Sequence, residues 1–538
     1  MTPTSRRLAA ASLALVVAVV GAGYGAGWFD DEELPSFREQ ACALPDPWLE
    51  RIERGHFPEH SGHISLLPRQ PAYMASGAGG WSHSGPWPYL QDVPLVFYGP
   101  GLIDEGVEVE RAVTVADVAP TLAALVKGSI NSDGHRLEEV AGLDAQRLMA
   151  RPPALVLTVV WDGGGWNTLD QWPDAWPQLR AVMDDGVSYT HATVGSSPSV
   201  TPSVHTTLGT GFWPATHGIS GIPVRDEEGK VADAFLKGES GRFLEVPTLA
   251  ERWDEQTNNE ALVGMVGYEP WHLGMIGQGA ERVGGDKDDA VWLDIETNEW
   301  ITNPDHYSLP PQLPATGGLE EGIEELDARD GEVNGSWRDW DVLEDAAHWE
   351  ETTAFIDYHA RGMMNMIQGE GYGRDKITDF LFTNFKQIDR LGHYHSMHGT
   401  EVRDALVESD KQLGALVDFL DEQVGEGRYV VVVTADHGQQ PDDEVIDGFG
   451  INPTELEADI KAEFGPILRG IWPTEAFFFP GKLAEYDVTV EEVARFIGDY
   501  RVRDNLGEGD RFLGEFDFND RIFTMAIPSH LLEKDLDC

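Results

Sequence analysis

The stretch ALVLTVVWDGGG, residues 154–165, decides how the fold is interpreted. It begins as an almost unbroken apolar run and stops at Asp162 and three glycines. A short apolar run bounded by turn residues is typical of a strand that is buried on both faces of a sheet. We therefore expect a strand at residues 154–161, with Asp162 at its carboxyl end.

Similar apolar runs recur along the chain, with helical spacing of apolar residues between them. Further strands are predicted at residues 93–99, 261–266, 380–384 and 429–434, and a helix at 116–126. This alternation predicts an α/β fold with a largely parallel central sheet and helices on both faces. In such folds, ligands bind beyond the carboxyl ends of the strands.

The 538 residues, 41% hydrophobic and 24% charged, suit a large folded core with additional segments. We expect an N-terminal anchor or signal at 1–29, a second segment at 30–150 and a main catalytic part at 151–538. Gly, Pro and acidic residues accumulate at about 230–351. This region is interpreted as an insertion that caps the site, or equally as a solvated surface excursion.

The net charge is strongly negative, because 93 acidic residues outnumber 38 basic ones to give −55. A surface of this sign repels the phosphate backbone of nucleic acids. Nucleic-acid binding is therefore not expected, and the acidity is best explained as a solvated surface.

Residues 8–29 carry no charge and lie between Arg6–Arg7 and an acidic run. About 20 apolar residues span a bilayer as a helix, and basic flanks stay in the cytoplasm. We expect a transmembrane helix that anchors the protein to the cell membrane with its catalytic part extracellular. A cleaved signal peptide and a secreted protein are the alternative.

The chain has two cysteines, Cys42 shortly after this apolar segment and Cys538 at the last position. They are too few for a thiolate zinc cluster. In an oxidising compartment they could form a disulfide, and two separate free thiols are the alternative.

Acidic and histidine residues follow three of the predicted strands. Asp162 follows the first, Asp389 and His393 the second, and Asp436 and His437 the third. A single Asp-His pair is often a helix cap beside a surface histidine. Three such groups at strand ends indicate a hydrolytic metal site, for which carboxylates and imidazoles are the ligands when thiolates are lacking.

A candidate nucleophile lies in SSPSVTPSVHTTLGTG, residues 196–211. Taken alone, this stretch is a polar loop leading into a helix whose N-cap is Thr201 or Ser203. A helix N-terminus also attracts anions, so a hydroxyl there would meet a phosphate group. A bound metal would lower the pKa of that hydroxyl and favour in-line attack.

Four blocks of the sequence resemble the alkaline phosphatase superfamily, in particular its nucleotide pyrophosphatase/phosphodiesterase branch. They are VWDG at 160–163, PSVT at 198–201 with PATHGI at 214–219, DRLGH at 389–393 and TADHG at 434–438. The resemblance implies a phosphothreonine intermediate on Thr201 and two divalent metal ions. It implies one ion held by Asp162, Thr201, Asp436 and His437, and another held by Asp389, His393 and one further histidine.

That further histidine normally follows the last of these blocks, but the matching block lies upstream. It is WSHSGPWPYLQDVPLVFYG at 81–99, followed by the similar VADVAPTL at 115–122. The resemblance therefore implies a circular permutation, in which residues 30–150 stand for the family's C-terminal part and His83 completes the second metal site. A disulfide between Cys42 and Cys538 would then restore the lost covalent link.

One departure concerns the phosphate contact. The branch has an Asn shortly after the HGI element, and residues 217–222 contain none. Asn384, Lys386 and Arg225 are candidates for this role, and none is preferred.

The sequence thus predicts a metal-dependent hydrolase of phosphate esters, first of all a phosphodiesterase or nucleotide pyrophosphatase. Zinc is the expected metal, with manganese or calcium possible. A phosphomonoesterase with the same site is one alternative, and an inactive binding module that retains the fold is another. A sulfatase is less favoured, because the loop at 196–211 lacks the Cys/Ser-x-Pro-x-Arg pattern.

Overall fold

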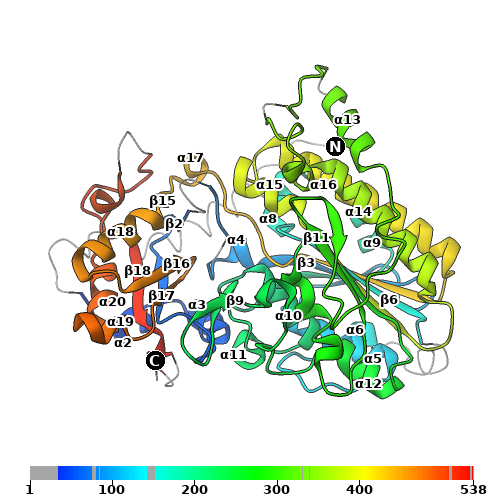
Figure 1. Cartoon of the computed structure of the whole chain (residues 1–538), viewed down its shortest axis with the longest axis horizontal. Helices are drawn as coiled ribbons and strands as arrows, with labels where there is room; N and C mark the ends of the chain where they lie inside the picture. The colour runs from blue at the N-terminus through cyan, green and yellow to red at the C-terminus, as the bar shows by residue number, and fades with distance from the viewer. Residues whose placement is uncertain are drawn as a thin grey trace, which may run out of the picture.

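A ten-stranded sheet forms the centre of the larger of two lobes (Figure 1). The computed structural model describes residues 34–75, 80–83, 85–141, 152–329, 331–338, 340–507, 512–532, 536 and 538. The strands of the sheet, in spatial order, are β12 (Glu299–Ile301), β11 (Asp289–Asp294), β10 (Val263–Val266), β13 (Asp379–Phe385), β6 (Leu155–Trp161), β14 (Tyr429–Thr434), β3 (Asp92–Tyr98), β7 (Val187–Thr193) and β4 (Val107–Val109), with β5 (Val113–Thr114) beside β7.

All strands of this sheet except β3 and β12 run in the same direction. Pairing is parallel from β11 through β10, β13 and β6 to β14, while β3 is antiparallel to both of its neighbours, β14 and β7. The predicted α/β fold with a largely parallel sheet is confirmed. The predicted strands and the helix at 116–126 are found at β3, β6, β10, β13, β14 and α5 (Val118–Val126).

Helices cover both faces of the sheet, as the apolar strands require. Along β6, Val156 and Val160 pack into one core, and Leu155, Leu157 and Val159 pack into the other. The first core includes residues of α5, α10 (Thr201–Thr210) and α12 (Leu249–Thr257). The second includes residues of α8 (Trp166–Gln171), α9 (Pro177–Asp184), α14 (Thr353–Met366), α15 (Gln387–His395) and α16 (Thr400–Gln423).

The smaller lobe combines the start and the end of the described chain. Its sheet has the order β16 (Leu468–Trp472), β17 (Glu475–Phe478), β1 (Ile64–Pro68) and β18 (Phe523–Pro528). Its helices include α2 (Phe37–Cys42), α3 (Asp46–Gly55), α18 (Pro453–Phe464) and α20 (Val490–Gly498). Beside this sheet, β2 (Tyr73–Met74) pairs with β15 (Gly450–Ile451).

A disulfide joins the two ends of the described chain, because Cys42 is bonded to Cys538 with 5.4 Å between their Cα atoms. The predicted pairing is therefore confirmed. The predicted transmembrane helix at residues 8–29 lies outside the described residues. Among the helices that the structure describes, none is long and apolar enough to span a bilayer.

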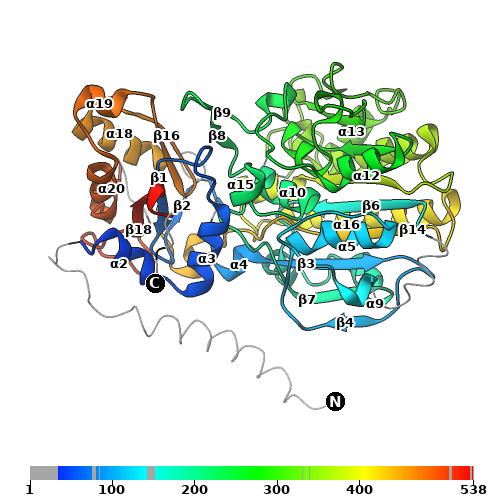
Figure 2. The same cartoon turned by 90° about the horizontal axis from the view of Figure 1, so that it is seen from below.

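The segment at 230–351 contributes to the central sheet as well as to the surface. It contains β10, β11 and β12, and also α13 (Leu319–Arg329). A hairpin of β8 (Pro223–Arg225) and β9 (Val231–Asp233) precedes these elements and reaches toward the smaller lobe (Figure 2). The boundaries at 30–150 and 151–538 remain predictions.

Candidate metal and phosphoryl-transfer site

Three adjacent strands, β13, β6 and β14, end beside one another and position most of the candidate residues. Asp162 directly follows β6, and Asp436 and His437 follow β14. After β13 the chain turns into α15, which carries Asp389 and His393 one helical turn apart on the same face. The α10 and α15 helices lie between the sheet and the smaller lobe in both views (Figures 1 and 2).

The candidate nucleophile, Thr201, is the first residue of α10 and is 3% exposed. Pro202 follows it in the first turn, where its fixed φ and missing N–H suit a helix start. The hydroxyl therefore lies at the positive end of the helix, close to the strand ends.

The first group of candidate ligands consists of Asp162, Asp436 and His437, all fully buried. His437 Nε2 lies 3.3 Å from Asp162 Oδ1 and 3.5 Å from Asp436 Oδ2. In a tetrahedral zinc site with bonds of about 2.0–2.1 Å, neighbouring ligand atoms are roughly 3.3–3.4 Å apart. The three atoms are thus spaced like the ligands of a single ion.

The second group brings His83 to Asp389 and His393, although 306 residues separate His83 from Asp389 in sequence. His83 Nε2 lies 3.4 Å from Asp389 Oδ1, and His393 Nε2 lies 3.4 Å from Asp389 Oδ2. The ring of His83 stacks on that of His437, with 3.5 Å between the centroids. The two groups are therefore adjacent.

The Nδ1 atom of each of these histidines faces a main-chain carbonyl. For His83 and His437 the acceptors are the carbonyls of Ser199 at 3.1 Å and Gly438 at 2.9 Å, and for His393 the acceptor is Trp81. A proton held on Nδ1 leaves the Nε2 lone pair free for a metal. The carboxylate oxygens Asp389 Oδ1 and Asp436 Oδ2 are buried and have no hydrogen-bond partner among the described residues, as expected of ligands for a cation.

The ammonium group of Lys386 is buried at the centre of the site. Its Nζ lies 3.1 Å from Thr201 Oγ1, 3.0 Å from Asp162 Oδ1 and 2.7 Å from Asp389 Oδ2. Burial lowers the pKa of Lys386, but the carboxylates of Asp162 and Asp389 outweigh this and raise it above its usual value. Lys386 is therefore charged and contacts both the nucleophile and a ligand of each group.

The surroundings of Asp436 and His437 raise the pKa values of both side chains. Burial, together with the nearby Asp162 carboxylate, raises the pKa of Asp436 to about 7. Burial lowers the pKa of His437, but the Asp436 carboxylate raises it to about 9. Since metal ligands must be deprotonated, an ion entering here would displace a proton from His437 at neutral pH.

The three candidates for a phosphate contact lie in different places. Lys386 is beside Thr201. Asn384 donates from Nδ2 to Asp162 Oδ2 at 2.9 Å and therefore orients a candidate ligand. Arg225 donates to the carbonyls of Pro58 and Ser61.

Sequence reasoning missed His205, which lies one turn after Thr201 on α10 and is fully buried. Its Nε2 is 3.5 Å from Asp436 Oδ2, and its Nδ1 is 2.7 Å from Nδ1 of His272. The (i, i+4) spacing from Thr201 was the one available signal, because it places both side chains on the same helix face.

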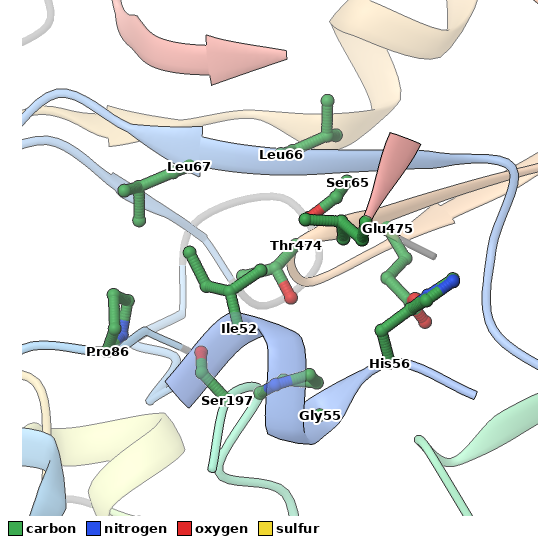
Figure 3. A pocket seen from close by; sticks show the side chains of 12 residues that line it. Ile52, Gly55, His56, Ser65, Leu66, Leu67, Pro86, Ser197, Thr474 and Glu475 are labelled. Atoms are coloured by element: carbon green, nitrogen blue, oxygen red, sulfur yellow. The ribbon is translucent and has the colours of Figure 1, made fainter. Parts of the chain in front are cut away.

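A narrow pocket lies elsewhere, where α3 meets the smaller sheet and the loop before α10 (Figure 3). Its lining includes His56, Glu475 and Ser197, and none of the candidate ligands. Burial raises the pKa of Glu475 to about 7 and lowers that of His56 to about 4. At neutral pH, His56 is therefore uncharged and Glu475 is only partly ionised. Their pocket is separate from the candidate site.

A threonine hydroxyl at the N-terminus of α10, next to two groups of Asp and His side chains, is the arrangement expected of a phosphoric ester hydrolase of the alkaline phosphatase superfamily. Residues 156–525 match the family model described as type I phosphodiesterase / nucleotide pyrophosphatase. The chain belongs to this family.

Curated relatives agree with the class. The chain is 24% identical over 412 residues to alkaline phosphatase PafA of Elizabethkingia meningoseptica, covering 66% of this chain and 74% of the relative. It is also 24% identical over 371 residues to alkaline phosphatase PhoV of Synechococcus elongatus, covering 59% and 64%. The crystal structure of wild-type PafA has the same fold, with a TM-score of 0.52 at 21% identity over 64% of this chain and 76% of PafA.

Proposed function

We propose that this protein hydrolyses phosphate diesters through a phosphothreonine on Thr201, with two divalent metal ions, most favourably zinc. The observation that carries the proposal is the position of the Thr201 hydroxyl, 3.1 Å from the Lys386 ammonium and beside two sets of Asp and His ligands. Asp162, Asp436 and His437 would hold one ion, with Thr201 as a further ligand. His83, Asp389 and His393 would hold the other. Bound ions would supply Lewis-acid stabilisation to the attacking and leaving oxygens.

The chain's own residues account for both halves of the reaction. Thr201 Oγ1 loses its proton and attacks phosphorus, the P–O bond to the first alcohol breaks, and that alcohol leaves carrying one proton, which balances the proton lost from Thr201. Water then attacks the phosphothreonine, which regenerates the Thr201 hydroxyl and releases a phosphate monoester. Lys386 stabilises the negative charge that develops on Oγ1, and the N-terminus of α10 binds the phosphoryl oxygens.

The charges near Thr201 favour a diester over a monoester. Lys386, the basic side chain that contacts Thr201, is already paired with Asp162 and Asp389. A diester carries one negative charge, whereas a monoester carries two above neutral pH. Since the Lys386 ammonium is already shared between two carboxylates, it is better matched to the single charge of a diester.

Phosphomonoester hydrolysis is the second candidate. Two of the curated relatives are named alkaline phosphatases, and each aligns with more than half of this chain. The two candidates share Thr201 and the metal ligands, and they differ only in what occupies the position of the second ester group.

The proposal includes a circularly permuted chain. The family match starts at Val156, in β6, whereas His83 and β3 precede it in sequence. Yet β3 pairs with β14 in the same sheet, and His83 lies against Asp389. Residues before the family match would therefore complete the second metal site.

The proposal also places the protein outside the cytoplasm. The disulfide between Cys42 and Cys538 supports an oxidising compartment. Residues 8–29 would attach it to the membrane, or would be removed to release it. Membrane fractionation under alkaline carbonate washing distinguishes these two forms.

The decisive experiment measures hydrolysis of bis(p-nitrophenyl) phosphate and p-nitrophenyl phosphate by the protein loaded with zinc or manganese. We expect a higher kcat/KM for the diester, and loss of both activities in Thr201→Ala and His83→Ala. Conversely, a preference for the monoester supports the second candidate, and no turnover with any metal supports a binding module. Retention of activity by His83→Ala contradicts the permuted site.

A further inference from the structure

A second acidic cluster lies away from the candidate site, at the end of α12. Asp254 comes from the last turn of that helix, and Asp286 and Asp288 come from the loop that leads into β11. One carboxylate oxygen of each residue lies within 4.8 Å of the other two. The cluster shares no residue with the site that contains Thr201.

Asp254 is buried in this cluster without a hydrogen-bond donor for one of its oxygens. The residue is 5% exposed, and Oδ1 has no partner among the described residues. Asp288 is 9% exposed, whereas Asp286 is exposed and opens the cluster to solvent. A buried carboxylate oxygen without a donor requires a proton or a cation.

Negative charges dominate the surroundings of these carboxyl groups. Burial and the adjacent Asp286 carboxylate raise the pKa of Asp254 to about 7. Burial, followed by the carboxylates of Asp254, Asp286 and Glu251, raises the pKa of Asp288 well above its usual value. All of these contributions disfavour the ionised state.

The neighbouring basic side chains are bound elsewhere. Lys287 lies between the two loop aspartates in sequence but donates to the carbonyl of Pro304. Arg282 pairs with Glu251 at 3.3 Å. Glu251, one turn before Asp254, also accepts from the main-chain N–H groups of Thr248 and Gln278, so its charge is compensated.

We propose that Asp254, Asp286 and Asp288 bind a calcium ion. Calcium takes oxygen ligands at about 2.3–2.6 Å, so its ligand oxygens lie up to about 5 Å apart, which the observed separation of 4.8 Å satisfies. A ligand set made only of carboxylates suits a hard cation rather than zinc. Water reaching the exposed side of Asp286 completes the coordination sphere.

The ion would connect the end of α12 to the loop before β11. Just after α12, Asn259 Nδ2 already donates a hydrogen bond to the carbonyl of Gly284 in this loop, at 3.3 Å. A cation between the three carboxylates would attract each of them and outweigh their repulsion of one another. Calcium therefore stabilises the larger lobe without taking part in the reaction.

The test uses the full chain, with its catalytic metal held at constant concentration and calcium removed from the buffer. We expect added millimolar CaCl2 to raise the unfolding temperature by about 3–5 °C. We also expect Tb³⁺ luminescence, sensitised by the adjacent Trp253, to appear on binding and to disappear when calcium is added.

The variant Asp286→Asn/Asp288→Asn removes two ligands, and Glu260→Gln/Asp305→Asn removes two exposed charges as the matched control. The cluster variant should lose the calcium-dependent rise while becoming more stable without calcium, and the control should behave as the unmodified protein. If the double variant does not fold, the single variant Asp286→Asn replaces it, because this position is exposed. The single variant should weaken calcium binding at least tenfold. The proposal is overturned if calcium does not raise the unfolding temperature of the unmodified protein, or if it raises that of the cluster variant by the same amount.

Discussion

Replacement of Lys386 by methionine tests the role given to this ammonium group. Methionine has a similar length and apolar volume, so the change removes the charge and leaves the packing nearly intact. The ammonium donates to Thr201 Oγ1 at 3.1 Å, and both side chains are buried, with Lys386 6% exposed and Thr201 3% exposed. It is therefore placed to stabilise the charge that develops on the nucleophile.

The contacts of Lys386 determine how much activity and how much stability the substitution should remove. Loss of one preorganised donor to a developing oxyanion costs about 2.7–4 kcal/mol, which corresponds to roughly 10²–10³ in kcat. Lys386 also neutralises Asp162 and Asp389, and removing one partner of a buried ion pair costs about 3–5 kcal/mol of folding free energy. A bound divalent ion offsets most of this second cost, so the metal-free variant should lose much more stability than the metal-loaded one.

The assay combines diester hydrolysis at saturating metal with thermal unfolding in the presence and absence of metal. Lys411→Met is the matched control, because the Lys411 side chain is 61% exposed on α16 and pairs with Glu408. The control should keep both activity and stability. If Lys386→Met folds and retains kcat within about threefold of the unmodified protein, the stabilising role assigned to its charge is wrong.

Three further predictions concern other parts of the molecule. Cys42→Ser removes the disulfide that closes almost the whole chain and should cost about 2–5 kcal/mol, seen as a lower unfolding temperature under oxidising conditions and as no further effect of dithiothreitol. The pKa of Glu475 is about 7 in the folded state, compared with the ordinary value of 4.5. Between these two pH values the folded state binds a proton that the unfolded state has lost. The free energy of unfolding should therefore fall by about 3 kcal/mol as the pH rises from 4.5 to 7. Glu475→Gln should flatten that part of the pH–stability curve, and an unchanged slope would contradict the assignment. His205→Ala removes the group beside Asp436 and should weaken binding of the first metal by about 10–100-fold in a zinc titration. Because His205 is fully buried and contacts His272, the same change should also lower the unfolding temperature of the metal-free protein.

The central sheet was predictable because its strands are buried on both faces. The run at 429–434 coincides with β14, and the run at 154–161 exceeds β6 by one residue. Such strands contain few polar residues, so the sequence marks their beginning and end directly. The strand ends then indicated Asp162, Asp389 and Asp436 as neighbours, since parallel strands end at the same edge.

The smaller lobe and the interior of the site could not be predicted in this way. In the smaller sheet, Ile64 lies opposite both Ala476 and Pro528, more than 400 residues away along the chain. No local pattern encodes such a pairing. Lys386 was one of three candidates for the phosphate contact, none of them preferred. Its contact with Thr201 depends on how α10 and α15 pack, which spacing alone does not fix.

The two connections between the lobes explain why the candidate site lies where it does. The chain leaves the smaller lobe after β2, passes the site at His83 and enters the larger sheet as β3. It returns from β14 through Asp436 and His437 to β15, which pairs with β2. Both connections therefore carry candidate ligands, and the His83 and His437 rings stack where they pass one another. A metal ion held by His83 together with Asp389 and His393 would therefore tie the first connection to the larger lobe, so metal binding would stabilise this arrangement of the two lobes.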